Sequence, residues 1–145
     1  MGFSIESTYD GRGQFAEDCI ASGTLTSGEL IVLTARAGKP TATACGATAV
    51  PHGIVDKGGL TTTDCTFVRI LPGDKLVTKA MAADGTTALS TAEKAACLAL
   101  VGTQVMKVAT GALYFDGVTT TGGKLELVNY DTNTDKVRVR VPIVS

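Results

Sequence analysis

The sequence predicts a mainly β fold with one short helix, and three observations support this prediction. The 145 residues include 22 Thr and 17 Gly, a composition that favours pleated strands joined by tight turns. Short apolar or alternating segments recur between turn residues along most of the chain. The stretches "SGELIVLTARAGK" (residues 27–39) and "PGDKLVTKAMAADGT" (residues 72–86) repeat one pattern at an offset of 45 residues. We therefore expect duplicated small β units, about residues 24–71 and 72–143, that together close one barrel-like domain.

The composition also excludes several classes of protein. Apolar residues make up 44% of the chain and charged residues 19%, which is typical of a globular chain rather than a disordered one. The formal net charge of −1 provides no overall basic field for nucleic acid. No apolar run reaches the roughly 18 residues of a membrane span, and the first residues lack the pattern of a signal peptide. We expect a protein that is made in the cytoplasm.

The first unit is predicted to contain four short strands. Residues 30–35 (LIVLTA) are rich in β-branched residues and short enough for a buried strand. Residues 41–44 (TATA) alternate after a turn, and residues 52–56 (HGIVD) form another short apolar segment. Residues 65–70 (CTFVRI) alternate again, which predicts a strand with one buried face.

The second unit repeats the strand at residues 75–81 (KLVTKAM) and then departs from the first unit. A short helix is predicted near residues 90–100, because Ser90 and Glu93 have the spacing of a capping box ahead of residues with high helix propensity. Residues 136–143 (KVRVRVPI) alternate strictly and take the place of the alternating strand that ends the first unit.

The repeat also predicts equivalent turns and equivalent core positions. Residues 28–29 fall on residues 73–74, which places a Gly and then an acidic residue in each turn. The motif "PGD" is interpreted as turn chemistry, with Pro at the second position and an acidic residue closing the turn. Val32 and Val77 fall at matching places, so both are expected in the core.

Residues 1–21 are predicted to form an extended N-terminal arm outside the β domain of residues 22–145. The segment has little periodicity, is interrupted by glycines, and contains one short stretch, "FSIES", that suits an edge strand. Its charged residues are mostly acidic: Glu6, Asp10, Glu17 and Asp18 against Arg12. Such an arm either frays or becomes ordered on a partner, and ordering on assembly is the interpretation that we favour.

The alternating strand near the C-terminus offers the one basic face. Lys136, Arg138 and Arg140 fall on one side of the strand and valines on the other. This face is either simply solvated or meets an acidic neighbour, for which the acidic arm of another copy is the obvious candidate. Nucleic-acid binding is the weakest option, because no aromatic residues interleave with the charges. These three residues and the five charged residues of the arm are the candidate partner contacts.

No catalytic, cofactor or metal site is expected. The one histidine, His52, is interpreted as structural because no nucleophile motif accompanies it. The spacing of the four cysteines matches no zinc motif, and a metal site with two histidines cannot be built. Two disulfides would be compatible with the count, but free buried thiols are favoured in a reducing compartment: Cys19, Cys45, Cys65 and Cys97.

The order of these motifs resembles that of tailed-phage head decoration proteins, which are also called capsid cement proteins. The resemblance rests on "SGELIVLTARAGKPTATA", "HGIVDKGG" and "TFVRI", then on "PGDKLVTKAMAADGTTALS", "VGTQVMKVATG" and the final "KVRVRVPI". It covers roughly residues 22–145, and the motifs are turn and strand patterns of moderate specificity. The long acidic arm and an insertion before residue 130 depart from the short members of the family.

The resemblance implies a β-tulip or β-barrel-like domain without catalytic activity, usually a homotrimer on the outer surface of a phage capsid. The expected partners are the major capsid protein and other copies of this chain, with no nucleic acid, membrane or cofactor. The alternative is an oligomeric β-domain adaptor, or a fibre or baseplate module, that binds another virion protein. A β-clip enzyme is a third class, although its characteristic uridine motif is missing from the sequence.

Overall fold

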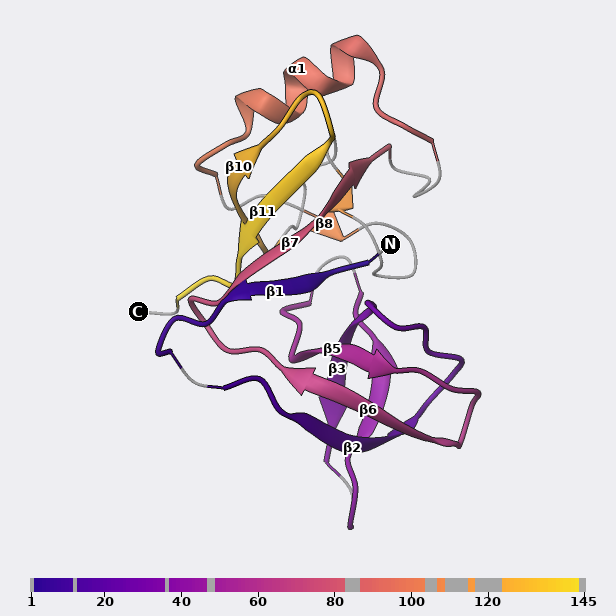
Figure 1. The fold of residues 1–145 in the computed structure, drawn as a ribbon. Coiled ribbons are helices and arrows are strands. Elements are labelled where there is room, and N and C mark those ends of the chain that lie inside the picture. The colour runs from indigo at the N-terminus through magenta and orange to yellow at the C-terminus, as the bar shows by residue number, and fades with distance from the viewer. Residues whose placement is uncertain are drawn as a thin grey trace.

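The chain folds into a closed barrel and a second, open sheet, and its single described helix lies beside the sheet (Figure 1). The computed structural model describes residues 2–11, 13–35, 37–46, 49–82, 87–103, 107–108, 115–116 and 124–143. For residues 107–108 and 115–116 it describes the backbone alone. The predicted fold class, mainly β and barrel-like with one short helix, is confirmed.

Most strands are short, as the spacing of turn residues predicts. The elements in chain order are β1 (Ser4–Ser7), β2 (Ala16–Ala21), β3 (Leu30–Thr34), β4 (Thr41–Ala44), β5 (Gly53–Lys57), β6 (Asp64–Arg69), β7 (Lys75–Met81), α1 (Thr91–Ala99), β8 (Lys107–Val108), β9 (Phe115–Asp116), β10 (Glu126–Tyr130) and β11 (Lys136–Arg140). The helix has the predicted capping box, in which the Ser90 side chain accepts from the Glu93 N–H and the Glu93 carboxylate accepts from the Ser90 N–H.

The barrel closes in the order β2-β4-β3-β5-β6, with β2 parallel to β4 and antiparallel to β6. Its interior is narrow, so small residues line most of it and one aromatic ring, that of Phe67, is fully buried there. Gly53 in β5 accommodates that ring, because a Cβ at this position would lie 2.8 Å from it. The residues that fill the barrel are Cys19, Ala21, Leu25, Ile31, Ala42, Val55, Cys65 and Phe67.

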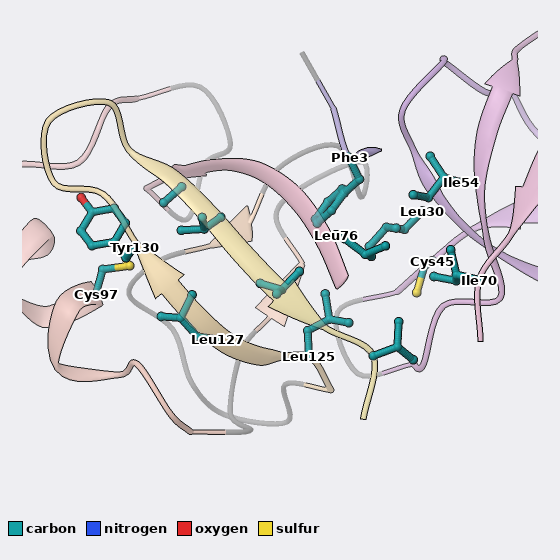
Figure 2. Close-up of a cluster of buried hydrophobic side chains, with 14 of the residues drawn as sticks. Phe3, Leu30, Cys45, Ile54, Ile70, Leu76, Cys97, Leu125, Leu127 and Tyr130 are labelled. Atoms are coloured by element: carbon teal, nitrogen blue, oxygen red, sulfur yellow. The ribbon is translucent and has the colours of Figure 1, made fainter. Parts of the chain in front are cut away.

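The open sheet has the order β10-β11-β7-β9-β8, and β1 pairs with the first half of β7. One face of the sheet is apolar because Val137, Val139 and Val141 alternate with charged residues along the strand and are buried. Cys97 of α1 is buried in the same core cluster as Tyr130 of β10. Figure 2 shows these two side chains together at one end of the core.

A single core cluster joins the sheet to the barrel. In Figure 2, Leu76 from the sheet and Phe3 from the N-terminal segment lie close to Leu30 and Ile54 from the barrel. All four residues are buried, with exposed fractions of 6% or less. The barrel therefore packs against the sheet through the ends of its strands, and its own interior forms a separate cluster.

The N-terminal segment is part of the folded body, which corrects the predicted arm of residues 1–21. Phe3 is buried in the main core and β1 pairs with β7. Strand β2 closes the barrel, and its Cys19 and Ala21 are buried. The small barrel requires apolar side chains at only these two positions of β2. The first half of the strand carries the acidic residues Glu17 and Asp18, which are not buried, so the strand shows no long apolar periodicity. The stretch "FSIES" does form the predicted edge strand.

The repeat is clearest in the turn and the strand that follows it. Gly28 and Gly73 both have a φ of 91°, the left-handed region that favours glycine, and β3 and β7 begin at the same distance after them. The pairing of this turn is also repeated. The Gly28 N–H donates to Val55 O of β5 and the Gly73 N–H donates to Val141 O, directly after β11, and the N–H groups of these valines donate back to Glu29 O and Asp74 O. The final alternating strand therefore corresponds to β5 rather than to β6.

The closure of the barrel also differs from the prediction that both units contribute to it. The barrel consists of β2 and the first unit alone, whereas the second unit forms the open sheet. The two expected core positions differ: Val32 is half-buried and packs against the main core cluster, whereas Val77 is half-buried and belongs to neither core cluster. Leu76 is fully buried, and because side chains alternate along a strand, Val77 lies on the outer face of the sheet.

Candidate docking surface

The predicted basic strand lies at the outer face of the open sheet. In β11 the charged residues alternate with buried valines, so that Lys136 and Arg138 are exposed and Arg140 is half-buried. The alternation of buried and exposed residues therefore follows the sequence pattern. The candidate contacts of this strand share one face, which is the first condition for a docking surface.

Two of these cations have partners within the chain. The Nε atom of Arg138 lies 2.5 Å from a carboxylate oxygen of Glu6, which reaches it from β1 across β7. A guanidinium nitrogen of Arg140 lies 2.6 Å from the carboxylate of Glu126 on β10. The acidic N-terminal segment thus meets the basic strand, as charge complementarity predicts, but the contact in the structure is made within one molecule.

The other acidic candidates lie elsewhere. Glu17 on β2 forms a bidentate ion pair with Arg69 on β6, with N–O distances of 3.0 and 3.1 Å. Hydrogen bonding to Glu17 raises the pKa of Arg69 above its ordinary value. Asp18 is exposed on β2 and Asp10 is exposed in the turn after β1. Glu17 and Asp18 lie on a strand of the barrel, whereas β11 is a strand of the open sheet, so these acidic residues are not on the same face as the basic residues of β11. Arg12 lies outside the described residues.

Two lysines on β7, Lys75 and Lys79, were not among the contact residues predicted from the sequence. The register of β7 with β11 places Lys79 directly opposite Lys136 and Lys75 directly opposite Arg140. The pattern that could have identified them is the alternation of "KLVTKAM", in which Lys75 and Lys79 fall on the same face as Val77. The outer face of β7 and β11 therefore presents five cations, which we call the basic face: Lys75, Lys79, Lys136, Arg138 and Arg140.

A groove of about 500 Å³ lies on the basic face beside the start of β1. Val77, Lys79 and Lys136 contribute to its lining together with four smaller residues, namely Gly2, Ser4, Thr78 and Thr134. Among the described residues, neither Lys79 nor Lys136 has a carboxylate within ion-pair distance. The groove combines two uncompensated positive charges with a short apolar surface, which suits an anionic group on a larger partner.

The side chains that could support catalysis have structural environments. His52 Nδ1 accepts a hydrogen bond from the Leu33 N–H at 2.8 Å, which fixes the start of β5 against β3. All four cysteines are free and buried. Burial raises the pKa of Cys19 and Cys45 to about 11 and that of Cys97 to about 12, so these three thiols are protonated at neutral pH.

Neither a metal-binding cluster nor a membrane-spanning helix is present in the part of the chain that the structure describes. No group of three or more His, Cys, Asp or Glu residues there could hold a metal ion. No helix there has the length and apolar character needed to cross a membrane. Comparison with known proteins found no family model and no curated sequence that matches the chain.

Proposed function

We propose that the chain is a structural virion protein that binds the outer surface of a phage capsid and stabilises the shell by bridging neighbouring capsid subunits. The observation that carries the proposal is the basic face of β7 and β11, where Lys75, Lys79 and Lys136 have no ion-pair partner among the described residues. A partly exposed sheet face with an excess of positive charge is suited to binding an oppositely charged protein surface.

The resemblance to head decoration proteins supports the same role. It rests on the turn-and-strand motifs of both units, and the turn motifs open β3 and β7, the two strands in register with the repeat. A protein that reinforces a shell needs a stiff body that transmits load between its contacts. Here the core cluster that joins barrel and sheet, together with β1 between them, provides this stiffness (Figure 1).

We further propose that the protein acts as a homotrimer. Three exposed apolar side chains, Tyr9 at 69%, Leu71 at 39% and Ile143 at 47%, are candidates for contacts between copies. The segments that carry them meet at Asp74, which accepts hydrogen bonds from the N–H groups of Tyr9 and Leu71 and whose carbonyl accepts from Val141. Apolar side chains exposed near one point of the surface are typical of a protein–protein contact.

The test is a binding experiment with expanded shells assembled from the major capsid protein encoded with this chain. We expect saturable binding in a co-sedimentation assay, a higher dissociation temperature of the decorated shell, and added density at three-fold or quasi-three-fold positions in electron micrographs. Bovine serum albumin at the same concentration is the control for protein that is carried into the pellet without binding to the shells. Absence of binding to shells, together with binding to another virion protein, would contradict the proposal and identify an adaptor.

A further inference from the structure

Lys79 and Lys136 are paired in a way that costs the isolated protein stability. The Ala80 N–H donates to Asp135 O at 2.8 Å, which makes the neighbouring register pair, Lys79 with Lys136, a non-hydrogen-bonded pair. Side chains of such pairs approach each other most closely in an antiparallel sheet. Like charges directly opposite each other are destabilising, so this pair lowers the stability of the sheet relative to a pair with a neutral or acidic residue.

The other cations of the basic face show how the chain relieves such repulsion. Arg138 is neutralised by Glu6 and Arg140 by Glu126. One acidic residue of the β10–β11 turn, Asp131, interacts weakly with Lys136. Hydrogen bonding from the Asn133 N–H is the main cause that lowers the pKa of Asp131, and the charge of Lys136 contributes less. Asp131 is not within ion-pair distance of either lysine.

The groove places both lysines around one open space. The two lysines line the groove together with Val77 of β7 and with Gly2 and Ser4 at the start of β1. A volume of about 500 Å³ accommodates several side chains of a partner. A carboxylate in this space could contact both ammonium groups, and two carboxylates of one acidic segment would neutralise them.

We propose that this lysine groove, lined by Gly2, Ser4, Val77, Thr78, Lys79, Thr134 and Lys136, binds an acidic peptide segment of the partner protein, with carboxylates paired to Lys79 and Lys136. The inference rests on the proposed function in docking to a partner protein, and it identifies carboxylates as the groups that the basic face binds. Carboxylates already occupy the two arginines of the same face, which shows the type of group that the surface accepts. Among the described residues that line the groove, none has an aromatic side chain on which a nucleic-acid base could stack.

The test is isothermal titration calorimetry with synthetic hexaglutamate as the probe. The variant is Lys79→Gln with Lys136→Gln, and the matched control is Lys57→Gln, which removes an exposed lysine of β5 on the barrel. We expect hexaglutamate to bind the wild-type protein, with an affinity that falls as salt increases. The double variant should bind at least about tenfold more weakly, and the control should bind like the wild type. Because the variant removes repulsion, it should melt at the same temperature as the wild type or higher.

Inorganic phosphate and single-stranded oligothymidylate, titrated under the same conditions, test the other anions. Tighter binding of the oligonucleotide than of hexaglutamate would overturn the proposal in favour of nucleic acid, and comparable binding of phosphate would reduce it to unselective anion binding. Equal affinity of the double variant and the wild type for hexaglutamate would also overturn it. Capsid binding that survives in the double variant would reject the groove while leaving the proposed function intact, because that function is measured with whole shells.

Discussion

Glu29 and Asp74 play the same structural role in the two halves of the molecule. The Glu29 carboxylate accepts a hydrogen bond from the Thr26 N–H at 2.7 Å, and the Asp74 carboxylate accepts one from the Leu71 N–H at 2.9 Å. In the reverse direction, the N–H of each acidic residue donates to the carbonyl of the same partner at 3.1 Å. Both turns are closed by the same pair of hydrogen bonds, although the strands around them are arranged differently.

Replacing these two acids with alanine should have unequal effects. Glu29→Ala leaves the Thr26 N–H without its acceptor, and we expect a loss of about 1–3 kcal/mol in the free energy of unfolding. Asp74→Ala also removes the acceptor of the Tyr9 N–H, so a larger loss of about 2–5 kcal/mol is expected. Urea denaturation followed by circular dichroism measures both. Equal losses would show that the contact with Tyr9 contributes nothing.

The stability of the protein should depend on pH through Glu29. Burial raises the pKa of this carboxyl above its ordinary value of 4.5, and its hydrogen bonds to Thr26 oppose that shift only in part. The folded state therefore binds the proton more tightly than the unfolded state does. The contribution of Glu29 to stability is complete below pH 4.5 and declines as the pH rises through the higher folded pKa.

The variant Glu29→Gln separates this effect from the turn hydrogen bond, because the amide oxygen can still accept from the Thr26 N–H. Between about pH 4 and pH 7 the stability of the wild type should fall relative to that of Glu29→Gln. Urea denaturation of both proteins at several pH values gives the comparison. A constant difference across this range would contradict the assigned shift in pKa.

Neighbouring positions of β7 should respond differently to substitution. Leu76 is fully buried in the main core, so Leu76→Ala should lower the free energy of unfolding by about 2–5 kcal/mol. Val77 lies on the outer face, and Val77→Asp should change it by less than about 1 kcal/mol, since the new carboxylate would stand among lysines and Arg138. Severe destabilisation by Val77→Asp would mean that this position faces the core after all.

Deletion of residues 2–18 should prevent folding. The deletion removes Phe3 from the main core, removes β1, and cuts β2 in the middle of the barrel wall. Shortening β2 removes the pairing partners of Thr66, Phe67 and Val68 on β6 and opens the barrel wall at this point. We expect loss of the cooperative thermal transition seen by circular dichroism. A truncated protein that melts close to the wild-type temperature would show that the segment is dispensable for the core.

The cysteines should remain reduced and unreactive in the folded protein. Cys19 and Cys65 are directly opposite each other on β2 and β6, but both are buried inside the barrel. Burial keeps the Cys19 thiol protonated at neutral pH, and the protonated form does not take part in thiol exchange. We expect the same intact mass before and after treatment with reductant, and reaction with a thiol reagent only after unfolding. An untreated sample lighter than the reduced one by the mass of two hydrogen atoms would reveal a disulfide.

Sequence reasoning succeeded where local patterns determine the structure. The alternation of residues 136–141 identified the buried valines, and the spacing of Ser90 and Glu93 identified the start of the helix. It failed for β2, because two small buried residues that follow two acidic ones carry no strong periodic signal. It also missed Lys79, since the opposition of Lys79 and Lys136 depends on strand register, which brings together residues far apart in the chain.

The contact of Glu6 with Arg138 has a consequence for synthesis on the ribosome. The strand that emerges first, β1, has no pairing partner until β7 has been made, and its ion pair waits for β11 near the other end of the chain. The barrel, in contrast, needs only residues 16–69 to close its hydrogen-bonded ring. We therefore expect folding during translation to proceed from the middle outward: the barrel forms first, the N-terminal strand pairs once β7 has been made, and its ion pair forms when β11 follows.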